Sequence, residues 1–212
     1  MNAMLIVVIV IAIIGTIPVI IRKKLLNNYL TLLQNNDIKA IEDLMATKLA
    51  KICIPQFNRE YLLLNVYLKI NDDKQIDTLV NNIMDHVPMT SKQKSALAQS
   101  VFYRYVDKKN ASMIDYLLEM VSTTNNHALC RQMDMVNDTL IKGGNKYYDE
   151  LKSNLADVEY TKNNEDTPYL EFLLSVIYKN MGNESKSKEY KNKALEDSKG
   201  TIYESLIHYQ NY

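Results

Sequence analysis

The chain has no tryptophan and only 5 glycines, 4 prolines and 2 cysteines among its 212 residues. Scarce glycine argues against dinucleotide-binding and P-loop folds, whose phosphate-binding turns need several glycines. The two cysteines form no C-x-x-C pair, which excludes a zinc ribbon and a thioredoxin-type site. The 25 basic and 25 acidic side chains cancel, so the chain has no overall field that would attract nucleic acid.

Charged side chains are also missing from residues 1–21, and residues 4–21 read MLIVVIVIAIIGTIPVII. As a helix this run would be about 27 Å long, close to the hydrocarbon core of a bilayer at about 30 Å. A cleaved signal peptide is the competing interpretation, but it needs a basic start and a small-residue cleavage site. Residues 1–3 and 22–24 (MNA and RKK) provide neither, so we expect residues 1–21 to be a retained transmembrane anchor.

The basic cluster at residues 22–24 also predicts the orientation of this anchor. The positive-inside rule places such a cluster on the cytoplasmic side of the membrane. We therefore expect a single-pass protein of the cell membrane, with residues 22–212 in the cytoplasm.

Beyond residue 22, apolar residues recur at spacings of three and four, which indicates helices throughout. Short polar breaks interrupt this pattern at intervals of about 36 residues, with a second set of breaks between them. The pattern predicts five helical hairpins of similar length, as in a helical solenoid. The turns within hairpins are expected at 35–37, 71–73, 109–110, 143–145 and 182–183, and the breaks between hairpins at 55, 88–91, 123–126 and 163–168.

The fifth hairpin carries the most specific pattern, because residues 169–197 read YLEFLLSVIYKNMGNESKSKEYKNKALED. This stretch resembles a tetratricopeptide repeat, which has Leu, a small residue and Tyr in its first helix, a glycine at the turn, and small residues in its second helix. The matching residues are Leu174, Ser175, Tyr178, Gly182, Ser187 and Ala194. Lys191 replaces an aromatic residue of the family, and the adjacent Tyr190 is a substitute for it.

The other hairpins resemble the family less closely. The second matches at Leu63, Tyr67 and Pro88, and the third has apolar residues and Tyr105 at equivalent positions. The first and fourth share only the period and the turns. The resemblance implies an all-α fold: a tetratricopeptide-like α-solenoid of about five helical hairpins over residues 22–212, preceded by one transmembrane helix. Residues 201–212 form an amphipathic segment that we expect to cap the array.

Few residues have a spacing typical of catalysis or metal binding. The three histidines, His86, His127 and His208, lie far apart, and we expect them on the surface or in the cap. Cys53 and Cys130 are interpreted as buried free thiols, although their spacing also permits a disulfide. The turn at 143–146 (GGNK) lacks the spacing of a phosphate-binding loop, so a helix end followed by a hairpin turn explains it. We expect no catalytic residues, no metal and no cofactor.

The resemblance to tetratricopeptide repeats implies a concave groove lined by the first helix of each hairpin, where extended peptides or partner helices bind. Tyrosines suit such a site because an apolar ring carries a polar hydroxyl. The alternative is that some of these tyrosines belong to the core between repeats. The groove residues implied by the match are Tyr61, Asn65, Lys69, Gln99, Tyr103, Asp107, Tyr169, Phe172 and Lys179.

These observations predict a non-catalytic scaffold that holds a partner protein or peptide at a membrane. Two alternatives remain open. An extracytoplasmic assembly or chaperone factor would have the same repeats on the other side of the membrane. An accessory or regulatory subunit would support an enzyme complex whose partner carries the chemistry.

Overall fold

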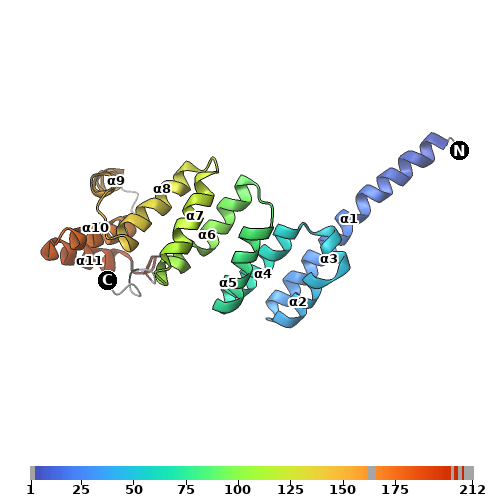
Figure 1. The fold of residues 1–212 in the computed structure, drawn as a ribbon, viewed down its shortest axis with the longest axis horizontal. Coiled ribbons are helices and arrows are strands. Elements are labelled where there is room, and N and C mark those ends of the chain that lie inside the picture. The colour runs from blue at the N-terminus through green and yellow to red at the C-terminus, as the bar shows by residue number, and fades with distance from the viewer. Residues whose placement is uncertain (1–2, 162–165, 202, 205–206, 208–212) are drawn as a thin grey trace. The chain divides into compact units, whose positions relative to one another are not determined.

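The computed structural model describes residues 3–161, 166–201, 203–204 and 207, with the main chain alone for residues 3–16 and 159–161. Every element in these ranges is a helix (Figure 1), which confirms the all-α prediction. The chain forms two compact units, residues 1–89 and residues 90–212. Each unit is described below by itself.

Unit 1 contains a long first helix with two short helices packed against it, followed by a pair of longer helices that pack against each other. Its buried core includes Ile41, Ala50, Ile54 and Leu64, which are at most 1 % exposed. Tyr29 joins this core from the first helix, and its hydroxyl donates to the Leu62 carbonyl at 3.2 Å. The helices of unit 1 are α1 (Ala3–Gln34), α2 (Ile38–Ala46), α3 (Lys48–Cys53), α4 (Gln56–Ile70) and α5 (Asp73–His86).

Unit 2 contains three further pairs of helices, and one helix lies at its centre. Every side chain of α10 from Thr167 to Tyr178 is buried, because α9, α11 and η1 all pack against this helix. The elements are α6 (Ser91–Asp107), α7 (Ala111–Ser122), α8 (His127–Val136), η1 (Asn137–Ile141), α9 (Tyr148–Thr161), α10 (Thr167–Asn180) and α11 (Glu184–Asp197).

The turns within four hairpins share one local structure. A residue with positive φ ends the first helix, and the Asp or Asn that follows caps the second helix with its side chain. In the last hairpin Gly182 has φ 75°, and Asn183 Oδ1 accepts from Lys186 N at 3.1 Å. Such a pair ends one helix and satisfies a free N–H of the next. The other three pairs are Asn36-Asp37, Asn71-Asp72 and Lys109-Asn110.

Six of the nine predicted breaks lie wholly between helices. The breaks at 71–73 and 88–91 end on the first residue of the next helix, and the break at 163–168, partly outside the described residues, includes the first two residues of α10. Two interruptions were not predicted. Thr47 ends α2 and caps α3, since its hydroxyl accepts from Ala50 N at 3.2 Å. At the end of α8 the chain widens into a π-helical turn, η1, in which Lys142 N donates to Asn137 O at 2.9 Å. Stacking of the five hairpins into one solenoid remains a prediction.

The predicted anchor and the predicted cap fall largely outside the described side chains. The first side chain that the structure describes is that of Ile17. In the part of the chain covered by that description, we find no helix that is both long enough and apolar enough to cross a membrane. Of the proposed cap, residues 201–212, only Thr201, Tyr203, Glu204 and Ile207 are described. The anchor and the cap therefore stay predictions.

Candidate functional site

The groove residues predicted in unit 1 all lie on α4, at intervals of four residues. Tyr61 is half-buried, and its ring stacks on Phe57 with centroids 5.4 Å apart. Asn65 and Lys69 are exposed. Lys69 Nζ donates to Asn36 Oδ1 at 2.9 Å, so this lysine links α4 to the end of α1 and is engaged within unit 1.

The groove residues predicted in unit 2 divide into an exposed set and a buried set. On α6, Gln99 and Asp107 are exposed and Tyr103 is half-buried, so the three form one stripe. On α10, Lys179 is exposed, but Tyr169 is 9 % exposed and Phe172 is 1 % exposed. Phe172 thus packs in the interior of unit 2, because α9, α11 and η1 pack against α10.

Two of the predicted tyrosines meet, although 66 positions separate them in the chain. The hydroxyls of Tyr103 and Tyr169 lie 3.1 Å apart, within hydrogen-bonding distance. Gln132 on α8 donates from Nε2 to the Tyr103 hydroxyl at 3.2 Å. Burial raises the pKa of Tyr169 well above its ordinary value, and the adjacent Tyr103 hydroxyl adds to the rise. Tyr169 therefore stays neutral and keeps its proton for hydrogen bonding.

Tyr169 also lines a hollow of about 480 Å³. There the Tyr169 ring stacks on Tyr203, with centroids 5.4 Å apart. The Tyr203 hydroxyl in turn donates to Asp166 Oδ1 at 2.7 Å. The lining residues are Gln132, Asn154, Asp157, Val158, Asp166, Tyr169, Leu170 and Tyr203.

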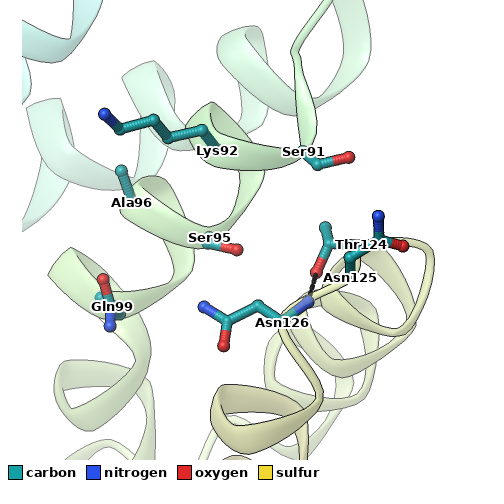
Figure 2. A pocket seen from close by; sticks show the side chains of 8 residues that line it. All are labelled: Ser91, Lys92, Ser95, Ala96, Gln99, Thr124, Asn125 and Asn126. Atoms are coloured by element: carbon teal, nitrogen blue, oxygen red, sulfur yellow. Dashed lines mark hydrogen bonds between the residues drawn. The ribbon is translucent and has the colours of Figure 1, made fainter.

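A second hollow, of about 450 Å³, lies along the N-terminal half of α6 (Figure 2). Gln99 lines it on α6, and the turn before α8 forms the opposite wall. Figure 2 shows the Asn126 side chain directed toward α6, and the Asn126 N–H donates to Thr124 Oγ1 at 3.2 Å. The lining residues are Ser91, Lys92, Ser95, Ala96, Gln99, Thr124, Asn125 and Asn126.

Gln132 lines the first hollow, and Gln99, one helical turn before Tyr103 on α6, lines the second. We call the two hollows and the Tyr103–Gln132 pair together the amide face. Its polar groups are mainly amides and hydroxyls, which both donate and accept hydrogen bonds. Its charged side chains are Lys92, Asp157 and Asp166. The amide face can therefore recognise a ligand by many neutral hydrogen bonds, with little demand for charge on that ligand.

A separate cluster of charged side chains joins α8 to the start of α9. Asp134 accepts from Lys146 Nζ at 2.8 Å and also from the Tyr147 hydroxyl. Arg131 Nε donates to Glu150 Oε1 at 2.7 Å. Burial opposes the ionisation of Asp134, but the bonds from Lys146 and Tyr147 outweigh it and lower its pKa. Since opposite charges are paired here, we assign the cluster a role in holding the fourth hairpin together.

The structure also shows where the glycine turn, the cysteines and two of the histidines lie. Gly143 has φ 65°, and Gly144 N donates to Asp138 O at 2.7 Å, so the GGNK segment is a hairpin turn as predicted. Cys53 and Cys130 are free thiols, but they are half-exposed and not buried. His86 and His127 are exposed, and His208 lies outside the described residues. Within the described ranges no group of three His, Cys, Asp or Glu side chains could hold a metal ion.

Sequence reasoning missed the amide residues that complete the site. Gln132 lies in the fourth hairpin, whose match to the repeat pattern was too weak to place its side chains. Asn125 and Asn126 were recognised only as a break between hairpins. The available signal was the pair Asn125-Asn126 directly before α8.

Comparison with known proteins gives no relative from which a function could be inferred: no family model, no curated protein and no solved structure matches the chain.

Proposed function

We propose that this protein is a non-catalytic scaffold that binds an extended segment of a partner protein on its amide face while its N-terminal apolar run attaches it to a membrane. The observation that carries the proposal is the meeting of Tyr103, Tyr169 and Gln132 on the amide face. Residues that the resemblance to tetratricopeptide repeats implies for one binding surface thus come together with an amide at hydrogen-bonding distance.

The chemistry of the amide face favours a peptide over other ligands. A peptide main chain presents alternating donors and acceptors, which Asn, Gln and Tyr side chains can match in either direction. Nucleic acid would require a row of cations facing its phosphates, whereas Lys92 is the one cation among the residues that line the two hollows. Tyrosine also contributes apolar contact area beside its hydroxyl, as is common at protein interfaces.

The architecture of the array is part of the proposal. The constant hairpin length and the repeated turn support a tetratricopeptide-like stacking of hairpins. Neighbouring hairpins in such an array bury each other's apolar faces and leave the first helices to line a binding surface. Gln99, Tyr103 and Gln132 lie on first helices, α6 and α8, as this arrangement requires.

Attachment to a membrane rests on the sequence. Residues 4–21 carry no charge, and residues 22–24 are all basic. A scaffold held on a surface gains effective concentration for its partner without tighter contacts. The partner is therefore expected to be another protein at the same membrane.

Site-directed photocrosslinking in cells tests the binding surface. A benzophenone amino acid replaces Gln99 or Asn125, both exposed on the amide face, and in a matched control it replaces Tyr116, which is 42 % exposed on α7. We expect one protein to crosslink at both amide-face positions and not at Tyr116. The crosslink at Gln99 should weaken several-fold in a Tyr103→Ala variant whose circular dichroism is unchanged.

Equal crosslinking at Tyr116, or a crosslink at Gln99 that Tyr103→Ala leaves unchanged, would show that the partner binds elsewhere. Turnover of a substrate by the purified chain would contradict the non-catalytic part of the proposal.

A further inference from the structure

Unit 1 exposes apolar side chains on its short helix α3. Ile52 is 80 % exposed and Leu49 is 54 % exposed. The two are three residues apart, so they share one face of the helix. The other apolar residues of this segment behave differently, since Ala50 and Ile54 are buried in the core of the unit. The sequence thus divides α3 into a buried side and an exposed apolar side.

The surroundings of this exposed side carry charge of one sign. Lys48 and Lys51 are exposed on α3, and Arg22, Lys23 and Lys24 are exposed on α1. Residues 1–36 and 47–59 contain no Asp or Glu. The acidic residues of the intervening helix α2 have other partners.

Glu42 accepts from the Tyr67 hydroxyl at 2.7 Å. Asp43 pairs with Lys39 at 3.4 Å. Both carboxylates keep their charge in these contacts, but the region remains basic, because residues 1–59 carry seven Lys and Arg against three acidic residues, Asp37, Glu42 and Asp43.

The position of α3 along α1 indicates where this surface would lie relative to a bilayer. A hollow of about 640 Å³ lies between the two helices, lined by Leu49 of α3 and by α1 residues from Ile21 to Thr31. That part of α1 rises by about 15 Å and begins where the charge-free run ends. On the side nearer the N-terminus, Val19 and Ile20 are 67 % and 66 % exposed. If residues 4–21 enter a bilayer, α3 therefore lies beside its headgroup layer.

We propose that α3 and the adjoining face of α1 form a lipid-contact patch for an anionic bilayer. Leu49 and Ile52 enter the boundary between headgroups and acyl chains, and Lys24, Lys48 and Lys51 bind lipid phosphates. The inference rests on the proposed membrane attachment and adds a second, lipid-selective contact to it. Apolar side chains bordered by lysines are the chemistry that interfacial segments use on anionic membranes.

The absence of tryptophan from the chain provides a direct test. In the full-length protein, Ile52→Trp places a single indole on the patch, and Tyr116→Trp places one on α7 as a matched control. Each variant is reconstituted with vesicles of neutral lipid and with vesicles containing anionic lipid, with and without brominated acyl chains. We expect the emission of the Ile52→Trp variant to shift to shorter wavelength and to be quenched by brominated lipid when anionic lipid is present. The control variant should show neither change.

Charge variants test the role of the lysines. On the Ile52→Trp background, Lys51→Gln should lower the equilibrium constant for binding of the patch to the bilayer about fivefold. This is the effect of one basic residue near an anionic surface. The double change Lys48→Glu with Lys51→Glu should abolish the quenching. The control double change, Lys152→Glu with Lys188→Glu, alters two exposed lysines of unit 2 and should leave the quenching unchanged.

Vesicle flotation of the same samples separates the two proposals. Failure to float with neutral vesicles contradicts attachment through residues 4–21, and the indole of the Ile52→Trp variant then still reports on the patch with anionic vesicles. Flotation with an indole that stays water-exposed in anionic vesicles overturns the patch. A shift that depends on protein concentration without lipid also overturns it, because a second copy of the chain is then the occupant.

Discussion

At the residue scale, tyrosine hydroxyls connect helices that lie far apart in the chain. The chain has 15 tyrosines but only 3 phenylalanines and no tryptophan. Tyr67 on α4 donates to Glu42 on α2 at 2.7 Å. The hydroxyls of Tyr148 and Tyr178 lie 3.0 Å apart, between α9 and α10. Each such side chain adds apolar packing and one specific hydrogen bond, which fixes the neighbouring hairpin in register.

The Tyr67–Glu42 bond predicts a pH-dependent contribution to stability. Burial, together with the bond to Glu42, raises the pKa of Tyr67 to about 12. At pH 8, Tyr67→Phe should lower the free energy of unfolding by about 1.5 kcal/mol, the value of a hydrogen bond to a charged acceptor. Because the folded-state pKa exceeds the unfolded value of about 10, the contribution is complete below pH 10 and is lost as the pH rises through 12.

Urea titrations between pH 8 and pH 12, followed by circular dichroism, measure this difference. The gap between wild type and Tyr67→Phe should close across that range. Tyr116→Phe, at a side chain that is 42 % exposed, serves as the control and should leave the free energy unchanged. A gap that stays constant to pH 12 would show that the hydrogen bond contributes little.

At the element scale, the repeated turn explains how one short sequence pattern sets the ends of eight helices. The first residue of each pair adopts positive φ, which costs an ordinary residue about 1–2 kcal/mol but costs glycine nothing. Asparagine tolerates this conformation better than other residues. Asn36, Asn71 and Gly182 are therefore suited to their positions, whereas Lys109 adopts φ 51° against its preference.

Gly182→Ala should destabilise the last hairpin by about 1 kcal/mol through backbone strain alone. An added Cβ would meet no atom within 4 Å, so a steric clash does not contribute. Gly182→Asn is the matched test, because the larger side chain tolerates positive φ. Gly182→Asn should lower the free energy of unfolding, measured by heat or urea, by less than Gly182→Ala does. Equal costs for the two variants would show that positive φ is not the determinant.

The same element scale shows how much of the fold the sequence reveals. Breaks marked by Gly, Pro or paired Asn and Asp were predicted correctly, because these residues act locally. The sequence offers only one weak indication of the interruption at Thr47, which is a residue type whose hydroxyl can cap a helix, as it caps α3 here. The π-helical turn depends on tertiary contacts, since Asn137 is fully buried and donates to Asp115 at 3.1 Å. No local pattern predicts such a contact.

The candidate site was also predictable only in part, because sequence patterns do not show which side chains tertiary packing buries. The resemblance to tetratricopeptide repeats implied Tyr103 and Tyr169, because both lie on first helices of hairpins. It could not show that Phe172, on the same helix as Tyr169, is only 1 % exposed, because that depends on how α9, α11 and η1 surround α10. Gln132 was missed because the fourth hairpin departs furthest from the repeat pattern.

At the scale of the whole molecule, each unit carries a different proposed interaction. Unit 1 joins the apolar run to a basic and apolar surface on α3, and unit 2 carries the amide face. This division places lipid contact and partner binding in separate compact units of one chain. A change in the α3 patch should therefore affect membrane contact without altering the chemistry of the amide face.

The last prediction concerns the side of the membrane on which both units lie. The basic residues 22–24 follow the apolar run directly, so the positive-inside rule predicts a cytoplasmic location for residues 22–212. The native thiols of Cys53 and Cys130 are free and half-exposed, so they report on sidedness without an added probe. In spheroplasts of a bacterial host, a membrane-impermeant maleimide should label the chain only after the membrane is permeabilised.

A variant with Cys53→Ser and Cys130→Ser should remain unlabelled throughout, which controls for reaction at other groups. Labelling in intact spheroplasts would contradict the cytoplasmic prediction and favour an extracytoplasmic assembly factor, because both thiols belong to the units that follow the apolar run.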